Sequence, residues 1–223
     1  PEVDRTFFCY GGTTEDSHQK YALGQGLPQN HCTEGILLHM VSYYDHTTGT
    51  VPKPTVVMDK RTHDAHDNPV MSIDGEGYIW IFSTSHGTMR PSYIHKSVRP
   101  YDITSFDLME PKLDAGDSVV PLDNFSYWQV WHKKSTGFEA YFTRYGNPVA
   151  RTLFYAVSDD GIHWTNHSRI EARRVGHYQI SAMGPDKTGS AFNYHPDRHK
   201  DGRHGLDMRT CPYYAHEMIT RRP

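Results

Sequence analysis

His66 and His86 stand near the two ends of the stretch THDAHDNPVMSIDGEGYIWIFSTSHG, which runs from Thr62 to Gly87. Within it, NPVMSID and YIWIFSTS are typical of strands, and DGEG between them is typical of a tight turn. In such a hairpin the beginning of the first strand lies beside the end of the second. We therefore predict that His66 and His86 are neighbours at one edge of a sheet.

Similar residue types recur where other predicted strands begin and end. Turn chemistry by itself favours Gly, Pro, Asn, Asp and Ser, so repeated His, Tyr and Arg at such positions indicate a functional face. Strand beginnings supply His66, Tyr127, His177 and Tyr178, and strand ends supply His46, His86, Arg144, Tyr145 and His195.

These residue types suit proton abstraction next to a carboxylate better than ordinary glycoside hydrolysis, which uses a pair of carboxylates. In β-elimination from a uronic acid, a cation neutralises the sugar carboxylate, a base removes the C5 proton, and an acid protonates the leaving oxygen. Arg144 can bind the sugar carboxylate in bidentate fashion. His66 or Tyr127 can act as the base with the other as the acid, while His86 orients or assists. The predicted substrate-binding residues are Tyr145, His177, Tyr178, Asn68 and His46.

Each of these residues also has a purely structural interpretation. A single His near a strand end is more often a surface group or one bonded within the fold, and a Tyr there usually serves packing. Asp64, Asp67 and Asn68 can simply cap the turn before Pro69. For His46 the structural interpretation carries as much weight as the functional one.

The elements that position these residues form a repeat along the chain. Each copy has a short strand, a Gly-containing turn, a more hydrophobic strand and then an outer strand, as in NPVMSID, YIWIFSTSH and SYIHKSV. The spacing fits the ~40–50 residues of a four-stranded propeller blade. We predict an all-β propeller with about four to five antiparallel blades, one domain or partial domain over 1–223, and part of a seven-bladed ring. The blade-like repeats lie near 30–60, 64–110, 125–170 and 176–220.

One turn has a more specific sequence. SDDGIHW, from Ser158 to Trp164, resembles the Asp-box turn common in glycan-active propellers, shortened by one residue. A β-hairpin turn with a buried Trp is the simpler interpretation of the same letters.

Composition excludes several classes of protein. The chain has 223 residues and a formal net charge of −3, with an isoelectric point near 6.6, which argues against a partner such as nucleic acid or a membrane surface. No apolar run approaches the roughly 20 residues of a membrane span. The chain begins at Pro1 without a signal-peptide pattern, so we expect a processed form or a fragment. Its three cysteines do not make a disulfide framework.

A second cluster of polar residues lies in FNYHPDRHKDGRHGLDMRTC. Imidazole and thiolate are good zinc ligands, but the spacing matches no standard zinc motif. A solvated, His-rich loop is the alternative to a metal site here. If a structural zinc binds, we expect His195 and Cys211 as ligands because each abuts a strand; no cofactor is required for the chemistry.

Several segments in order resemble the BNR-4 repeat family of β-propeller proteins: DAHDNPVMSIDGEGYIWIFSTSHG, YFTRY, GHYQIS and GSAFNYHPD followed by RTCPYY. The resemblance runs from about Tyr43 to the C-terminus. It implies a seven-bladed propeller, related to ulvan lyases and rhamnose–glucuronate lyases, that is secreted or periplasmic and monomeric when complete. Those lyases use two His, a Tyr and an Arg, and the matching positions here are His66, His86, Tyr127 and Arg144. The implied partner is an acidic polysaccharide or oligosaccharide.

Two rival functions stay open at the level of sequence. A non-catalytic glycan-binding propeller can use the same Tyr, Trp and His surface. A sialidase-like hydrolase shares the propeller and the Asp-box but needs an arginine cluster. The chain has Arg144, Arg151, Arg173 and Arg174, without evident recurring blade positions for them.

Overall fold

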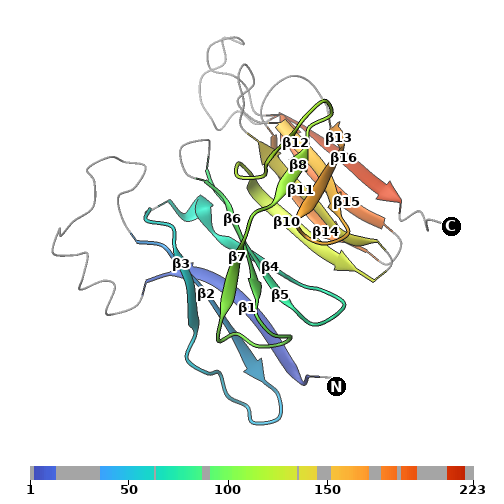
Figure 1. Cartoon of the computed structure of the whole chain (residues 1–223). Coiled ribbons are helices and arrows are strands. Elements are labelled where there is room, and N and C mark those ends of the chain that lie inside the picture. Colours follow the sequence, from blue (N-terminus) through green and yellow to red (C-terminus); the bar gives the residue numbers. More distant parts are fainter. Residues whose placement is uncertain are drawn as a thin grey trace. The chain divides into compact units, whose positions relative to one another are not determined.

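The protein is described here by a computed structural model that covers residues 3–13, 36–62, 64–86, 91–134, 136–144, 152–170, 177–184, 187–194 and 210–218. These residues form strands and one short 3-10 helix, in two compact units, Pro1–Met109 and Glu110–Pro223. Figure 1 labels the strands and colours them along the chain from blue to red. Among the described residues, no helix has the length and apolar character needed to cross a membrane.

The first unit contains two antiparallel sheets. One is formed by β1 (Arg5–Gly12), β2 (Leu38–Asp45) and β3 (Thr55–Asp59). After the 3-10 helix η1 (Ala65–Asp67), the second sheet runs in chain order through β4 (Pro69–Ile73), β5 (Ile79–Ser83), β6 (Tyr93–Ser97) and β7 (Phe106–Met109).

The hairpin of β4 and β5 follows from its local sequence. Gly77 has a φ of 90°, which a residue without Cβ adopts at no steric cost, and its N–H donates to the carbonyl of Asp74 at 3.0 Å. The carboxylate of Asp74 also accepts from the indole N–H of Trp80 at 2.9 Å. All five residues of β5 are buried, as expected for the apolar run IWIFS with strands on either side. The predicted hairpin and its DGEG turn are confirmed.

The core of the first unit joins its two sheets. Val41 of β2 packs with Ile79 and Ile81 of β5 and with Ile103, and all four are at least 90% buried. Phe7 of β1 lies against this cluster. Apolar burial of this kind drives the association of strands that are far apart in the sequence.

The second unit contains a six-stranded and a three-stranded sheet. In the larger sheet the order is β10-β11-β12-β13-β8-β9, and β8 pairs in parallel with β13 while the other neighbours are antiparallel. The smaller sheet has the antiparallel order β14-β15-β16. The strands are β8 (Lys112–Asp114), β9 (Val119–Pro121), β10 (Ser126–Lys133), β11 (Gly137–Arg144), β12 (Thr152–Ser158), β13 (His163–Ile170), β14 (His177–Met183), β15 (Lys187–Tyr194) and β16 (Thr210–Met218).

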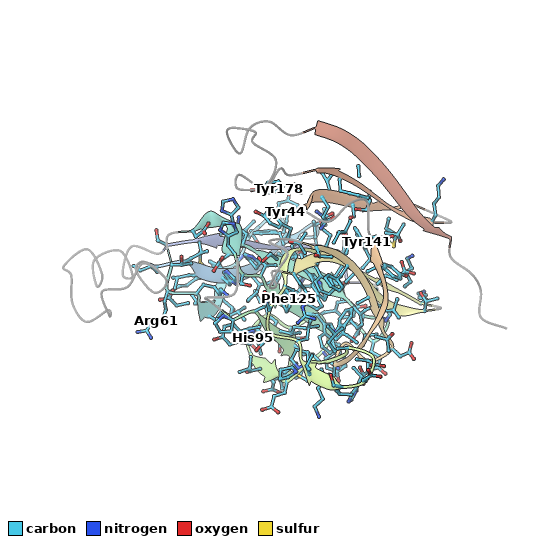
Figure 2. The ribbon with its side chains drawn as sticks, turned by 90° about the horizontal axis from the view of Figure 1, so that it is seen from above. Tyr44, Arg61, His95, Phe125, Tyr141 and Tyr178 are labelled. Atoms are coloured by element: carbon cyan, nitrogen blue, oxygen red, sulfur yellow. The ribbon has the colours of Figure 1, made fainter. Side chains whose placement is uncertain are left out.

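Aromatic side chains fill the interior of the second unit. Trp128 packs against Phe142 at 4.3 Å between ring centroids and edge-on against Trp164 at 5.1 Å. Phe125 and Tyr141 are also fully buried and are labelled in Figure 2. Aromatic residues bury large areas, so these rings supply much of the unit's hydrophobic stabilisation.

A buried ion pair links the two sheets of this unit. Lys133 of β10 contacts Glu139 of β11, and both bond to the hydroxyl of Thr188 on β15. Lys133 and Glu139 are 8% and 4% exposed, so each charge needs the other as a partner.

The turn between β12 and β13 has the bonds of a rigid loop. Ser158 Oγ accepts from the N–H of Gly161 at 2.9 Å, and Asp160 Oδ1 accepts from the N–H of His163 at 2.7 Å. The indole N–H of Trp164 donates to the carbonyl of Gly161 at 3.0 Å. The turn and its buried Trp therefore have the geometry that the SDDGIHW sequence indicates.

The prediction of an all-β chain with antiparallel hairpins and added outer strands is confirmed. The described residues show separate sheets and no closed ring, so the propeller and its number of blades stay predictions. Two features differ from the sequence-based expectation. The first sheet begins at Arg5, well before residue 30, and β8 and β9 extend the second unit's main sheet through a parallel pairing. Both depend on pairing between distant segments, which local patterns do not reveal.

Candidate functional site

His66 and His86 lie side by side at one edge of the hairpin of β4 and β5. The register pairs Pro69 with Ser83, so the residues before β4 and after β5 meet. The two imidazole rings are stacked, with centroids 4.3 Å apart and planes inclined by 18°. The predicted proximity of the two histidines is confirmed.

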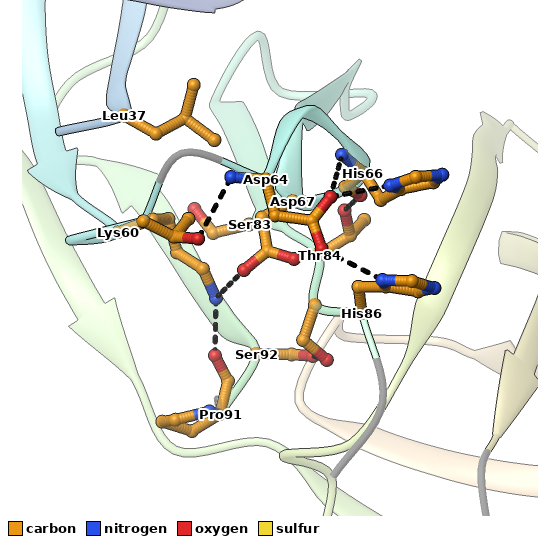
Figure 3. A network of polar contacts seen from close by, with 12 residues as sticks. Leu37, Lys60, Asp64, His66, Asp67, Ser83, Thr84, His86, Pro91 and Ser92 are labelled. Carbon is orange, nitrogen blue, oxygen red and sulfur yellow. Dashed lines mark hydrogen bonds and ion pairs between the residues drawn. The ribbon is translucent and has the colours of Figure 1, made fainter. Parts of the chain in front are cut away.

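A single carboxylate, that of Asp64, contacts both rings (Figure 3). Its Oδ1 lies 2.5 Å from Nδ1 of His66, and its Oδ2 lies 2.8 Å from Nδ1 of His86. Oδ1 also accepts from the backbone N–H of His66 at 3.0 Å, as the cap of η1. Asp64 thus fills the capping role that the sequence indicated and, in addition, bonds to both histidines, which sequence reasoning missed.

Asp64 is ionised in this environment. Partial burial raises the pKa of its carboxyl group, but bonds from the backbone and imidazole of His66 and from His86 lower the pKa further, to well below its usual range. Because a carboxylate only accepts hydrogen bonds, we assign a proton to the Nδ1 atom of each ring. In the neutral form of that tautomer the lone pair is on Nε2, the atom that acts as a base.

A buried ion pair supports the turn that carries Asp64. Lys60 Nζ lies 3.8 Å from Asp67 Oδ2 and donates to the carbonyl of Pro91 at 2.5 Å. The side chains of Lys60 and Asp67 are 1% and 0% exposed. The N–H of Asp67 in turn donates to the carbonyl of Asp64 at 3.1 Å, so the buried pair is tied to the turn above it.

His39, in the middle of the apolar run ILLHMV, is also buried near this edge. Its Nδ1 lies 2.8 Å from Ser83 Oγ at the end of β5. Burial, with a smaller effect of the cation of Lys60, lowers the pKa of His39 to about 3. His39 is therefore a neutral, structural histidine. The sequence signal for it was a lone His inside a hydrophobic strand, which is typical of a buried polar contact.

The structure places His46 away from the histidine pair. At the end of β2, Asp45 pairs with Arg5, and the N–H of His46 donates to the backbone carbonyl of Asp4 at 3.0 Å. Near the other end of β2, His39 contacts Ser83. At roughly 3.3 Å per residue, the seven steps from His39 to His46 span about 23 Å. The start of β2 therefore meets the His66–His86 edge, and the end that carries His46 points away, with His46 bonded to Thr6 Oγ1 at 2.8 Å.

Asn68 connects η1 to β4. Its carbonyl accepts from the hydroxyl of Thr84 at 2.7 Å, and Thr84 also donates to the carbonyl of His66 at 3.2 Å. Asn68 Oδ1 lies close to Gly11, where an added Cβ would approach it to 2.6 Å. These contacts join the two sides of the hairpin just below the histidine rings.

Tyr127, in the second unit, sits at a β-bulge of β10 with a φ of 51°. A left-handed backbone is costly for a bulky residue and often marks a functional position. Its ring lies edge-on to that of Tyr178, at 5.2 Å, and Gln179 Nε2 donates to its carbonyl at 2.6 Å. The structure thus brings Tyr127 and Tyr178 together.

Arg144 ends β11 in the same hairpin as Tyr127. Ser126 of β10 pairs with Thr143 of β11, and Tyr127 and Arg144 are the next residues along these two strands. The guanidinium lies 5.8 Å from the ring centre of Phe154. Burial lowers the pKa of Arg144 from its ordinary value, and the negative charge of Asp123 opposes this shift.

The remaining predicted residues lie wholly or partly outside the described part of the chain. Tyr145 and His195 lie outside it. His177 begins β14 and Cys211 lies in β16, but only their backbones are described. The predicted zinc ligands therefore stay a prediction.

One group of described residues has the ligand types of a metal site. Atoms of Asp64, His66 and His86 that can ligate a metal all lie within 4.8 Å of one another. However, both Nδ1 atoms already contact separate carboxylate oxygens, and the near-parallel rings direct their lone pairs side by side and not toward one point. The arrangement fits proton transfer better than metal coordination.

The solved structures that resemble this chain include two of an ulvan lyase, described as a new family of polysaccharide lyase, and one of these has -[GlcA(1-4)Rha3S]- bound. Each match has 20% sequence identity and a TM-score of 0.52, and covers 72% of this chain and 43% of the lyase chain. This chain thus spans less than half the length of the lyase. The likeness supports a fold shared with this polysaccharide lyase. No protein-family model and no curated protein matches the chain.

Proposed function

We propose that the chain carries part of the active site of a polysaccharide lyase that cleaves uronic-acid-containing glycans by β-elimination. The observation that carries this proposal is the pair of stacked imidazoles held by Asp64 at the hairpin edge. The ring of His66 is about half exposed, with a side-chain exposure of 48%, so a substrate can reach it. The fold shared with an ulvan lyase supports the same class of reaction.

In this mechanism the guanidinium of Arg144 pairs with the substrate carboxylate, which makes the C5 proton more acidic. His66 or Tyr127 removes that proton, and the electrons of the C5–H bond form the C4–C5 double bond. The C4–O4 bond breaks, and the other of the two residues protonates O4 of the leaving sugar. His86 assists His66. The chemistry requires no cofactor.

The surrounding protein is proposed to be a BNR-repeat propeller of which this chain is a segment. Two observations support this: the sheet of β4 to β7 is an antiparallel meander of four strands, and the turn from Ser158 to Trp164 is closed by hydrogen bonds to Gly161 from within the turn and holds a buried Trp. A polymer-degrading protein of this kind acts outside the cytoplasm, so we propose secretion or a periplasmic location. A structural zinc at His195 and Cys211 remains part of this proposal.

Ultraviolet absorbance with ulvan and rhamnoglucuronans as substrates tests the reaction, because the new C4–C5 double bond absorbs and a hydrolysis product does not. We expect a rising signal that falls about 10²–10⁴-fold in His66→Ala, the range of a general acid or base. His163→Ala is the matched control, since His163 also bonds a carboxylate through Nδ1, that of Asp160, at 2.7 Å. A flat trace from folded wild-type protein would refute the lyase and favour a glycan-binding role.

A further inference from the structure

We propose that Asp64 is a positioning residue shared by both histidines, holding His66 and His86 in the tautomer that carries the proton on Nδ1 and the lone pair on Nε2. This inference rests on the proposed function for its catalytic meaning. The two oxygens of one carboxylate are divided between the rings, with Oδ1 at 2.5 Å from His66 and Oδ2 at 2.8 Å from His86. One side chain thereby sets the orientation of both imidazoles.

The stacking of the rings depends on the same carboxylate. His66 lies within η1 and His86 follows β5, so different segments of the chain carry the two rings. Their centroids are only 4.3 Å apart and their planes nearly parallel. Since both Nδ1 atoms face Asp64, both Nε2 atoms are turned to corresponding sides of the stack. The two Nε2 atoms therefore have the same orientation relative to the stack.

Asp64 is itself held in place from several directions. Its N–H donates to Thr62 Oγ1 at 3.0 Å, and its carbonyl accepts from Asp67, whose carboxylate faces the buried Lys60. Rotation of the Asp64 side chain is further restricted because it accepts the backbone N–H of His66. A group that orients catalytic side chains is effective when its own position is fixed in this way.

The experiment is ¹⁵N NMR of the imidazoles in the full chain, in the wild type, Asp64→Asn, Asp64→Ala and Asp160→Asn. In the wild type we expect Nδ1 protonated and Nε2 unprotonated in the neutral form of both rings. Asp64→Asn keeps one acceptor oxygen and puts an N–H donor in place of the other, so it should change the tautomer of one ring, whereas Asp64→Ala removes both acceptors and should change both rings to mixed tautomers. Asp160→Asn is matched, because Asp160 also bonds an imidazole and backbone N–H groups, and it should alter His163 alone.

Kinetics and a second substitution complete the test. With a lyase substrate, Asp64→Asn should lower kcat about 10²-fold or more while KM changes little, because orientation is lost and not substrate binding. Asp64→Glu keeps a carboxylate and should restore the Nδ1 proton in at least one ring, even if Asp64→Asn folds poorly. Unchanged tautomers of both rings in folded Asp64→Asn, or a change in one ring only in folded Asp64→Ala, would overturn the shared role. Absence of lyase activity with the expected tautomers would instead overturn the proposed function and leave the positioning role standing.

Discussion

The buried ion pair beneath the histidines yields a quantitative prediction. Lys60→Met keeps an unbranched apolar side chain of similar length but removes the cation that faces Asp67 at 3.8 Å. Both side chains are at most 1% exposed, so the carboxylate stays in a place that water does not reach. Removing one partner of such a pair costs about 3–5 kcal/mol of the free energy of unfolding.

That loss is large compared with the whole stability of a domain, which is about 5–15 kcal/mol. At about 2–4 °C per kcal/mol for a chain of this size, Tm should fall by roughly 6–20 °C. Urea denaturation and thermal unfolding followed by circular dichroism measure both quantities. Lys53→Met is the matched control, since Lys53 is exposed, and it should stay within about 0.5 kcal/mol of the wild type.

The double variant Lys60→Met with Asp67→Asn distinguishes the loss of charge pairing from the loss of packing. Without a charge on residue 67, the penalty for burying an uncompensated carboxylate disappears, and we expect recovery of at least half of the lost stability. If Lys60→Met alone unfolds at the wild-type urea concentration, the claim of a buried, mutually dependent pair is wrong.

Two further predictions concern a backbone position and the pH dependence of stability. Gly137→Ala should destabilise the protein by at least about 1 kcal/mol in urea denaturation, because Gly137 has a φ of 70° and an added Cβ would lie 2.5 Å from the carbonyl oxygen of Ser158. Gly116 also has a positive φ, but an added Cβ there would meet no atom within 4 Å, so Gly116→Ala should destabilise the protein less. Burial lowers the pKa of His39 in the folded protein to about 3. The contribution of neutral His39 to the free energy of unfolding is therefore complete above the ordinary pKa near 6.5 and is lost as the pH falls from there toward 3. The free energy of unfolding should change by at most ~1.4 kcal/mol per pH unit in this range. Urea denaturation across that range should show a smaller slope in His39→Gln, and an equal slope would contradict the assignment.

The sequence alone was sufficient for the hairpin of β4 and β5 and for the proximity of His66 and His86. A hairpin's register is set by its own turn and by alternation along its strands, so the information is local. The same locality explains why the turn at Asp74 and the outer strands were predicted correctly.

Only the tertiary structure decided which groups surround the histidines. Asp64 has the sequence signature of a cap, and nothing in its neighbours along the chain shows that its second oxygen reaches His86. Lys60 meets Asp67, and His39 meets Ser83, only because apolar burial brings β2, η1 and β5 together.

The direction of β2 shows most clearly what the sequence alone does not determine. The sequence predicts a strand that ends at His46, and β2 ends one residue earlier, at Asp45, but the pairing with β1 and the packing against β5 direct its other end toward the site. Strand direction within a fold depends on contacts between segments tens of residues apart, whose free energy is summed over the whole core. Local patterns therefore determine the hairpins and their residues, whereas the packing of distant strands determines which residues share a site.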